Sequence, residues 1–262
     1  MNRPSRPARV LASALATGAL LATSACAGDD TSTRTVPAAD ASSSAPPSLT
    51  KDGAKAALIT EADIEDSWTQ VDDAASWRDK LLVGKVDVAA FLTGKAAAAD
   101  CQKLLDSVYA ESVLGRPSGE SALTGFTEGD ARLLYQVGQY DGKSLDKSLD
   151  QLEKTTAECD QFTVDGAGGQ RTVQVVDLEL PKAGDARQGL TMTVQGTTDG
   201  APVTLSVDLA VVRVGSSAIT VTNGGPVQAD HDSTERAVQQ GAGRLKDVLA
   251  GRTPPADPGT FD

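Results

Sequence analysis

The stretch VTLSVDLAVVRV, residues 203–214, decides the fold class. Aliphatic residues alternate with small or polar ones from Val203 to Leu209, which is the pattern of a β-strand with one buried face. From Val211 the pattern becomes almost continuously aliphatic, and charged side chains are few along the whole stretch. We therefore expect this strand to lie at the centre of a sheet.

Short strand-like segments flank this central stretch on both sides. They are, in chain order, Ser121–Thr127, Ala131–Tyr140, Thr172–Leu180, Leu190–Gln195 and Ser217–Thr222. Turn signals separate neighbouring segments: Glu128-Gly129-Asp130, Gly184-Asp185, Asp199-Gly200 and Gly215. Consecutive short strands with tight connections predict an antiparallel meander.

Two amphipathic helices are expected before the later strands. Apolar residues at i, i+3, i+4 and i+7 mark one face of the first: Cys101, Leu104, Leu105 and Val108. The second is expected to begin with Ser144 as its cap and to reach about Cys159, with one apolar face: Leu145, Leu149 and Leu152.

A further helix closes the chain, capped by Asp232 or Ser233, with one inner face: Val238, Gly241, Leu245, Val248 and Leu249. Leu58–Ile64 is a short helical start, with Thr60 as N-cap and Asp63 at the third position of a capping box. Helices before and after a meander predict an α+β domain, with an antiparallel sheet covered on one face by helices.

The chain has three cysteines, of which Cys101 and Cys159 lie in this predicted domain, 58 positions apart. No histidine or CxxC pattern accompanies them, so a zinc site is disfavoured. In an exported protein such a pair forms a disulfide. We expect one structural bridge between Cys101 and Cys159 that ties two helices together.

The first 25 residues have the features of an export signal. Arg3, Arg6 and Arg9 precede a short apolar run and small residues, whereas a membrane-spanning helix would need a longer apolar run. Leu20–Cys26 is similar to the lipobox of bacterial lipoproteins, with Thr23 in place of the usual aliphatic residue. This resemblance implies a diacylated Cys26 on the cell membrane; the alternative is an ordinary signal peptide and a free thiol.

Composition divides the remainder of the chain. Residues 26–50 are rich in Ser, Thr, Ala and Pro and are expected to form a disordered tether. Residues 51–251 form the folded domain, and residues 252–262, rich in Pro and Asp, form a loose tail. The net charge of -12 disfavours binding of nucleic acid, which needs a basic surface.

Catalytic and metal motifs of the familiar kinds are missing from the sequence, and no cofactor is expected. The single histidine lies in Asp230-His231-Asp232, which we interpret as an acidic helix start with an exposed imidazole. A catalytic relay would require Ser216 or Ser217 beside it.

An acidic cluster between residues 63 and 73 is interpreted as a solvated face, with a calcium site as the alternative: Asp63, Glu65, Asp66, Asp72 and Asp73. The glycine-rich residues 165–169 are interpreted as a hairpin turn.

Aromatic residues make up only 3% of the chain, so each large one is a weak candidate for ligand binding. Trp68 and Trp77 lie close in sequence and either line a cleft or pack against the first helix. Tyr135 and Tyr140 alternate out of phase, which predicts that one hydroxyl faces the open side of the sheet.

Four segments resemble the extracellular sensor domain of the mycobacterial kinase PknH and related sensor-domain lipoproteins. These are Leu58–Ile64, the Cys101 helix, Cys159–Phe162, and Val211–Gly215 with the helix that follows. The resemblance covers residues 55–250 and implies an α+β fold with a ligand-binding cleft. Members of that family typically carry two disulfides, whereas this chain has one pair outside the signal.

Three functions remain open from the sequence. The first is a non-enzymatic ligand-binding or sensor module on the extracytoplasmic face, anchored through acylated Cys26, whose partner is a small molecule or cell-wall fragment. The second is a scaffold that docks an envelope protein through an apolar surface patch. The third is a hydrolase that uses carboxylates alone.

Overall fold

The structure is a computed structural model, and it describes most of the folded domain predicted over residues 51–251. The described residues are 48–64, 67–77, 82–83, 86–87, 94–96, 98–109, 112–166, 169–226 and 228–256. The predicted signal, Cys26 and most of the predicted tether lie outside the described residues. None of the helices in the described part is long and apolar enough to span a bilayer.

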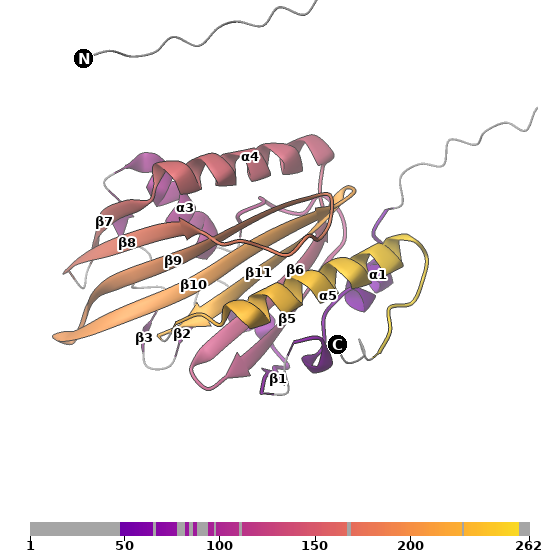
Figure 1. Cartoon of the computed structure of the whole chain (residues 1–262), viewed down its shortest axis with the longest axis horizontal. Coiled ribbons are helices and arrows are strands. Elements are labelled where there is room, and N and C mark those ends of the chain that lie inside the picture. The colour runs from indigo at the N-terminus through magenta and orange to yellow at the C-terminus, as the bar shows by residue number, and fades with distance from the viewer. Residues whose placement is uncertain are drawn as a thin grey trace, which may run out of the picture. The chain divides into compact units, whose positions relative to one another are not determined.

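A twisted antiparallel sheet forms the body of the domain (Figure 1). Its strand order is β1-β5-β6-β11-β10-β9-β8-β7-β4, and β2 and β3 form a separate pair. The bounds are β1 Thr69–Gln70, β2 Leu82–Val83, β3 Val86–Asp87, β4 Lys95–Ala96, β5 Ser121–Glu128, β6 Ala131–Gln139, β7 Gln161–Gly166, β8 Gly169–Asp177, β9 Ala186–Thr198, β10 Ala201–Val214 and β11 Ser217–Gly225. The predicted antiparallel α+β fold is confirmed, with β7 to β11 as a continuous meander.

The strand built from the quoted stretch, β10, lies fifth among the nine strands, as predicted. Its alternate side chains enter two different hydrophobic cores. Leu209 and Val211 contribute to one core, and Ala210 and Val212 to the other. The continuous aliphatic run from Val211 is thus the signature of a strand buried on both faces.

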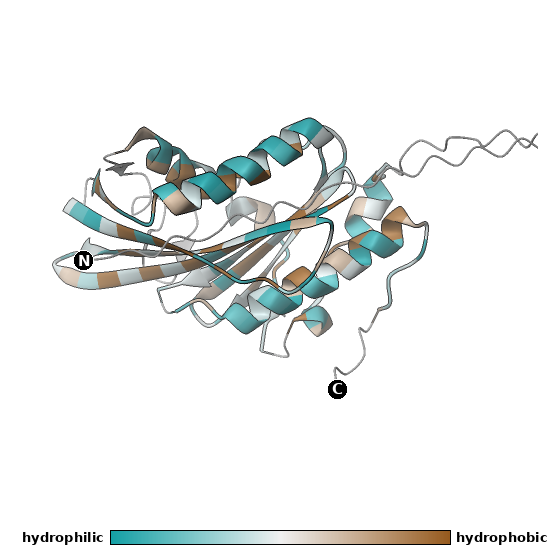
Figure 2. Cartoon of the chain, turned by 45° about the horizontal axis from the view of Figure 1, so that its top comes forward, coloured by the Kyte–Doolittle hydropathy of each residue, from teal (hydrophilic) through white to brown (hydrophobic). Residues whose placement is uncertain are grey.

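Helices cover both faces of the sheet, which corrects the prediction of a single covered face. Figure 2 shows α3 and α4 on one side of the sheet and α1 and α5 on the other. The bounds are α1 Lys51–Ala56, α3 Ala99–Tyr109, α4 Gly142–Glu158 and α5 His231–Leu249, with short 3-10 helices η1 Glu61–Asp63 and η2 Ala74–Trp77. The α3 face predicted from spacing is buried, as are the leucines of α4.

The helices begin at side chains that cap the first turn, and the sequence predicted these positions to within a few residues. The side chain of Asp141, rather than Ser144, caps α4, and Asp230, rather than Asp232 or Ser233, caps α5. Each of these carboxylates accepts from a backbone amide in the first turn of its helix, and its negative charge suits the positive end of the helix dipole. At η1, the amide of Thr60 donates to Asp63 Oδ2 over 2.7 Å, so the predicted pairing of these two residues is confirmed.

The predicted disulfide is confirmed. Cys101 in α3 is bonded to Cys159 at the end of α4, with 5.6 Å between their Cα atoms. The bridge joins two helices that lie on the same face of the sheet, next to strand β7.

Both ends of the domain are packed. Leu49 is buried in the core beneath α5, two residues before the expected start of the fold. At the other end Pro254 is buried, and Arg244 of α5 donates from Nη1 to the Pro255 carbonyl over 2.9 Å. The polypeptide is thus held to α5 as far as residue 255.

Candidate functional site

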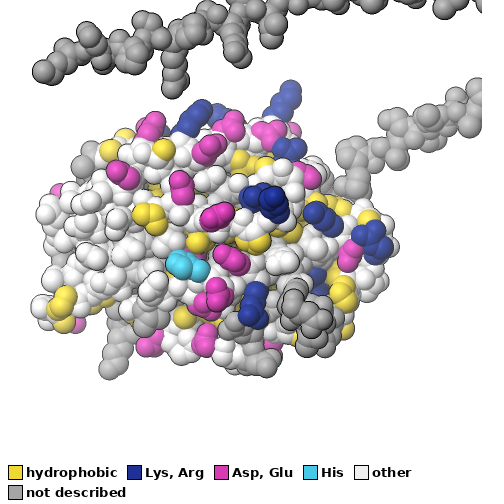
Figure 3. All heavy atoms as spheres, in the orientation of Figure 1, with side chains coloured by type: hydrophobic (Ala, Val, Ile, Leu, Met, Phe, Trp, Pro, Cys, Tyr) yellow, Lys and Arg dark blue, Asp and Glu magenta, His cyan; other side chains and the backbone are white. Residues whose placement is uncertain are grey.

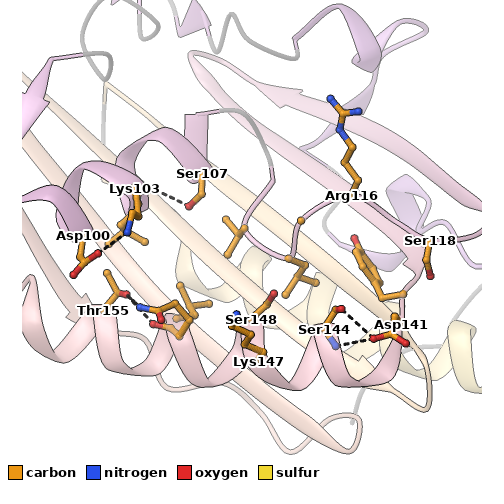
Figure 4. Close-up of a pocket in the computed structure, with 17 residues that line it drawn as sticks. Asp100, Lys103, Ser107, Arg116, Ser118, Asp141, Ser144, Lys147, Ser148 and Thr155 are labelled. Carbon is orange, nitrogen blue, oxygen red and sulfur yellow. Dashed lines mark hydrogen bonds and ion pairs between the residues drawn. The ribbon is translucent and has the colours of Figure 1, made fainter.

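A cavity of about 640 Å³ lies between α3 and α4 and is closed at one end by the loop of residues 112–118 (Figure 4). The disulfide joins the two helices at the opposite end of α4. The lining residues are Asp100, Lys103, Leu104, Ser107, Val113, Leu114, Gly115, Arg116, Ser118, Tyr140, Asp141, Ser144, Lys147, Ser148, Gln151, Leu152 and Thr155. A volume of this size accommodates a small organic molecule.

The inner wall of the cavity is apolar. Leu104 of α3, Leu152 of α4, and Leu114 in the loop are each at most 5% exposed and belong to one hydrophobic core. Tyr140, which follows β6, is 6% exposed and lines the same cavity. An apolar part of a ligand would find contacts with carbon on this wall without having to displace a buried charge.

Both carboxylates of the cavity are already engaged. Asp100 accepts from Lys103 Nζ over 2.9 Å, and this hydrogen bond raises the pKa of the Lys103 ammonium. Asp141 accepts from both the amide and the hydroxyl of Ser144 at 3.0 Å, and the amide bond holds the pKa of Asp141 below its ordinary value. Each carboxylate thus has a structural partner among the described residues.

Two cations of the rim are not neutralised. Arg116 and Lys147 are exposed, and within the described part of the chain neither forms an ion pair or hydrogen bond. Figure 4 shows the Arg116 side chain extending from the loop, away from the other side chains that line the cavity. The cavity therefore carries an excess of positive charge in a protein whose net charge is -12.

Of the four aromatic candidates, the structure places only Tyr140 in the cavity. Trp68 is 2% exposed, and its Nε1 donates to Ser233 Oγ over 2.9 Å, so it is a core residue beneath α5. Trp77 is half-buried and stacks under the guanidinium of Arg132 at 4.9 Å.

Tyr135 is fully buried on the opposite face of the sheet. Its hydroxyl donates to the Ala57 carbonyl over 3.2 Å, and burial raises the pKa of Tyr135 well above its ordinary value. Tyr135 and Tyr140 contribute to different cores, and both are at most 6% exposed. The prediction that one hydroxyl faces an open side of the sheet is therefore wrong, because both rings are buried.

The single histidine is not the freely exposed group expected from its sequence neighbours. His231 Nδ1 lies 2.6 Å from Oδ2 of Asp208, a fully buried carboxylate in the middle of β10. Asp208 also accepts from Thr191 Oγ1 at 2.7 Å and from Thr234 Oγ1 at 3.1 Å. Asp208 precedes His231 by 23 positions and lies in a different element, so the sequence neighbours of His231 do not indicate this contact.

No catalytic relay is assembled around this histidine in the described residues. Ser217 begins β11 opposite Val214, whereas Asp208 lies opposite Asn223 at the far end of the same strand pair. The serines considered from the sequence are therefore remote from His231, and no hydroxyl or thiol of the described part is hydrogen-bonded to its Nε2.

The acidic cluster of the sequence is divided in the structure. Asp63 is 2% exposed and pairs with Arg244 at 3.2 Å, so it belongs to the core and not to a solvated face. Asp72 and Asp73 are exposed, and Glu65 and Asp66 lie outside the described residues. Among the residues that the structure describes, no group of three acidic, histidine or cysteine side chains is arranged to hold a metal ion.

The glycine-rich segment joins two strands, as predicted. Gly166 of β7 pairs with Gly169 of β8, which makes the connection a hairpin without a helix at its end. Residues 167 and 168 lie outside the described part.

The family resemblance implied a cleft, but the position and the lining of this cavity were not predicted from the sequence. Its rim combines Arg116, Lys147 and Ser144, which are scattered over an irregular loop and the polar face of a helix. The one relevant signal was the predicted disulfide, which correctly joined α3 to the end of α4 and so brought the two walls together.

No protein-family model matches the chain, and no curated protein matches it. Similar solved structures include the extracellular domain of PknH from Mycobacterium tuberculosis, with a TM-score of 0.44, 12% identity, and coverage of 79% of this chain and 100% of that one. Another is an uncharacterised Rv0999 ortholog from Mycobacterium smegmatis, with a TM-score of 0.39, 18% identity, and coverage of 78% and 98%. The first of these is the domain that the four sequence segments resemble.

Proposed function

We propose that the protein is a non-enzymatic ligand-binding module on the extracytoplasmic face of the cell membrane, anchored by lipid on Cys26. The observation that carries the ligand-binding part is the cavity between α3 and α4, with its apolar wall and cationic rim. The lipobox-like segment before Cys26 supports the anchoring part.

The cavity favours a ligand with an apolar body and one anionic group. Leu104, Leu114 and Leu152 offer buried carbon surface, and Arg116 and Lys147 offer charge that no carboxylate of the described part neutralises. A carboxylate or phosphate at the rim would gain charge-assisted hydrogen bonds there. Lys103, by contrast, is already bound by Asp100.

Binding is favoured over catalysis and over docking of a protein by apolar contact. The two carboxylates of the cavity already serve as the ion-pair partner of Lys103 and as the cap of α4, which explains their presence without a catalytic role. The scaffold hypothesis expected a contiguous apolar patch. Within the described part, Val176 is the exposed large hydrophobic side chain.

The test of ligand binding uses the purified mature protein and a matched set of amphiphiles: dodecyl phosphate, dodecanoate and dodecanol. Calorimetric titration should show binding of the two anions and weaker binding of the alcohol. Replacing Leu152 with Trp fills the cavity and should abolish binding. The double substitution Arg116→Gln and Lys147→Gln removes both rim charges and should lower the affinity for the two anions by about tenfold. This is the loss expected when a charged hydrogen bond is removed.

Lys154→Gln is the matched control, because it removes an exposed cation of the same helix that does not line the cavity. Equal binding of alcohol and anions would refute the anionic class of ligand. Failure of all three amphiphiles to bind would refute the cavity as their site.

Anchoring is tested separately on the intact chain in its native host. Mass spectrometry of the N-terminal peptide should find Cys26 carrying a diacylglycerol. Cys26→Ala should move the protein from the membrane fraction to the medium or to the soluble envelope fraction. An unmodified thiol in membrane-bound protein would contradict the proposed anchor.

A further inference from the structure

A second surface of the domain carries aligned rows of uncharged polar side chains. It is the face of β7 to β10 that lies opposite α4. The strand register aligns two complete rows of side chains across these four strands. The first row is Gln161, Gln174, Thr193 and Ser206, and the second is Thr163, Thr172, Gln195 and Thr204.

All eight side chains of these rows are neutral hydroxyls or amides, in a chain of which 23% of residues are charged. Five of them are exposed: Gln161, Thr163, Gln174, Gln195 and Thr204. The intervening residues, such as Val173 and Val194, enter the core on the α4 side, so the strand alternation fixes which residues face outward. We call these eight residues the hydroxyl-amide face.

Helix α5 lies on the same side of the sheet but covers β10 and β11 and leaves β7 to β9 uncovered (Figure 1). Figure 3, drawn from this side, shows a mostly white area beside His231, in contrast to the charged side chains along α5. Where the rows meet α5, the buried carboxylate of Asp208 is already satisfied by His231, Thr191 and Thr234. No unpaired charge of the described residues therefore lies within the two rows.

The spacing of the rows suits an extended partner. Neighbouring strands are about 4.8 Å apart, and side chains two positions apart on one strand are separated by about 6.7 Å. Accessible donors and acceptors thus recur in both directions across β7 to β9 and continue to Thr204 of β10, whereas Ser206 is buried. A hydroxyl both donates and accepts, and an amide offers both functions side by side, so each position can adapt to either kind of partner atom.

We infer that the hydroxyl-amide face binds a neutral polyhydroxylated polymer, that is, a glycan without charged groups. Sugar hydroxyls are donors and acceptors in close succession, and they match a surface whose groups are both, with no charge to desolvate. A polyanion would find no cation in the rows, and an apolar partner would bury hydroxyls and amides without hydrogen bonds, at a cost of about 1–3 kcal/mol for each orphaned group. This inference does not depend on the cavity between α3 and α4.

The test uses the mature protein in native gels that contain dextran, galactan or mannan, with polygalacturonate as the charged comparison. We expect retardation in at least one of the three neutral gels that persists at high salt, because no ion pair is involved. The double substitution Gln174→Glu and Gln195→Glu preserves side-chain shape and places a carboxylate in each row. It should weaken retention by about tenfold, as expected for an unpaired charge at a desolvated contact.

The matched control is Gln228→Glu with Gln239→Glu, which adds the same charge at exposed positions outside the rows. The mobility of each variant is compared between gels with and without polysaccharide. The control double variant and the cavity-filling Leu152→Trp should both be retarded as much as the wild type. The inference is overturned if none of the neutral polymers retards the wild type, or if both double variants behave alike. It is also overturned if sedimentation shows that Gln174→Glu with Gln195→Glu separates a dimer, which would make the face a contact between two copies.

Discussion

Two glycines of α5 allow a sharp test of how the terminal helix packs against the sheet. Gly241 is buried, and a Cβ built on it would lie 2.5 Å from the Tyr135 hydroxyl oxygen and 2.6 Å from a ring carbon of the same residue. Gly243, two positions later, is exposed, and a Cβ there meets no atom within 4 Å. Replacing each with Ala isolates packing from helix propensity, because the two residues share one helix.

The expected magnitudes follow from three contributions. Gly→Ala inside a helix is worth about 1 kcal/mol of stability, and this gain applies to both variants. At Gly241, overpacking costs about 1–3 kcal/mol. Displacing the Tyr135 hydroxyl also breaks its hydrogen bond to Ala57, worth about 1 kcal/mol. The net expectation is that Gly243→Ala stabilises by about 1 kcal/mol and Gly241→Ala destabilises by about 1–3 kcal/mol.

Urea denaturation of both variants beside the wild type, followed by circular dichroism, measures the free energy of unfolding directly. Gly241→Ala should lower the midpoint and Gly243→Ala should raise it, with unchanged slopes. The reasoning is refuted if Gly241→Ala stabilises the protein as much as Gly243→Ala, because Tyr135 would then not lie against α5.

Three further predictions concern the disulfide, a helix cap and the buried carboxylate. Replacing both Cys101 and Cys159 with Ser should lower the unfolding free energy by about 4 kcal/mol, the loop entropy of a 58-residue separation, in the same urea assay; a loss under about 1 kcal/mol would contradict this. The folded-state pKa of Asp141 is depressed, so its contribution is present above the unfolded pKa and is lost as the pH falls through the folded pKa. Asp141→Asn should accordingly flatten the acid side of a plot of stability against pH, and an identical profile would show that the cap does not form. Asp208→Ala removes the partner of the His231 imidazole and the acceptor of the Thr191 hydroxyl, while the Thr234 hydroxyl keeps the Asp230 carbonyl as an acceptor, and it should destabilise by about 1–3 kcal/mol. His231→Ala should cost less because the Thr191 hydroxyl keeps its acceptor; equal losses would refute that ranking.

Strand positions and tight turns were predictable because their signals are local. The period-two alternation located β10, and the turn at Asp199-Gly200 has positive φ at both residues, as a tight hairpin requires. The disulfide was also predictable, since only one pairing remained once Cys26 was assigned to the signal.

Features that depend on tertiary pairing were not predictable in the same way. The side chains of β10 alternate between two cores, each covered by helices. The alternation in the sequence does not show whether the second face of the sheet packs against helices or is exposed to solvent. The contact between His231 and Asp208 joins residues of two elements that the sequence keeps apart. The cationic rim of the cavity is carried by Arg116 in an irregular loop and by Lys147 on the polar side of α4, and both look like ordinary surface residues in the sequence.

One side chain links the two ends of the domain. The Arg244 guanidinium contacts the carbonyl oxygens of Ala56, over 3.5 Å, and of Pro255, over 2.9 Å. The end of α1, near the start of the domain, and the segment after α5 are therefore within reach of a single arginine. A circular permutant that joins these ends with a short linker and opens the chain at the Asp199-Gly200 hairpin tip should retain the whole sheet order. The new N-terminus, and with it the proposed lipid anchor, would then lie at the turn between β9 and β10.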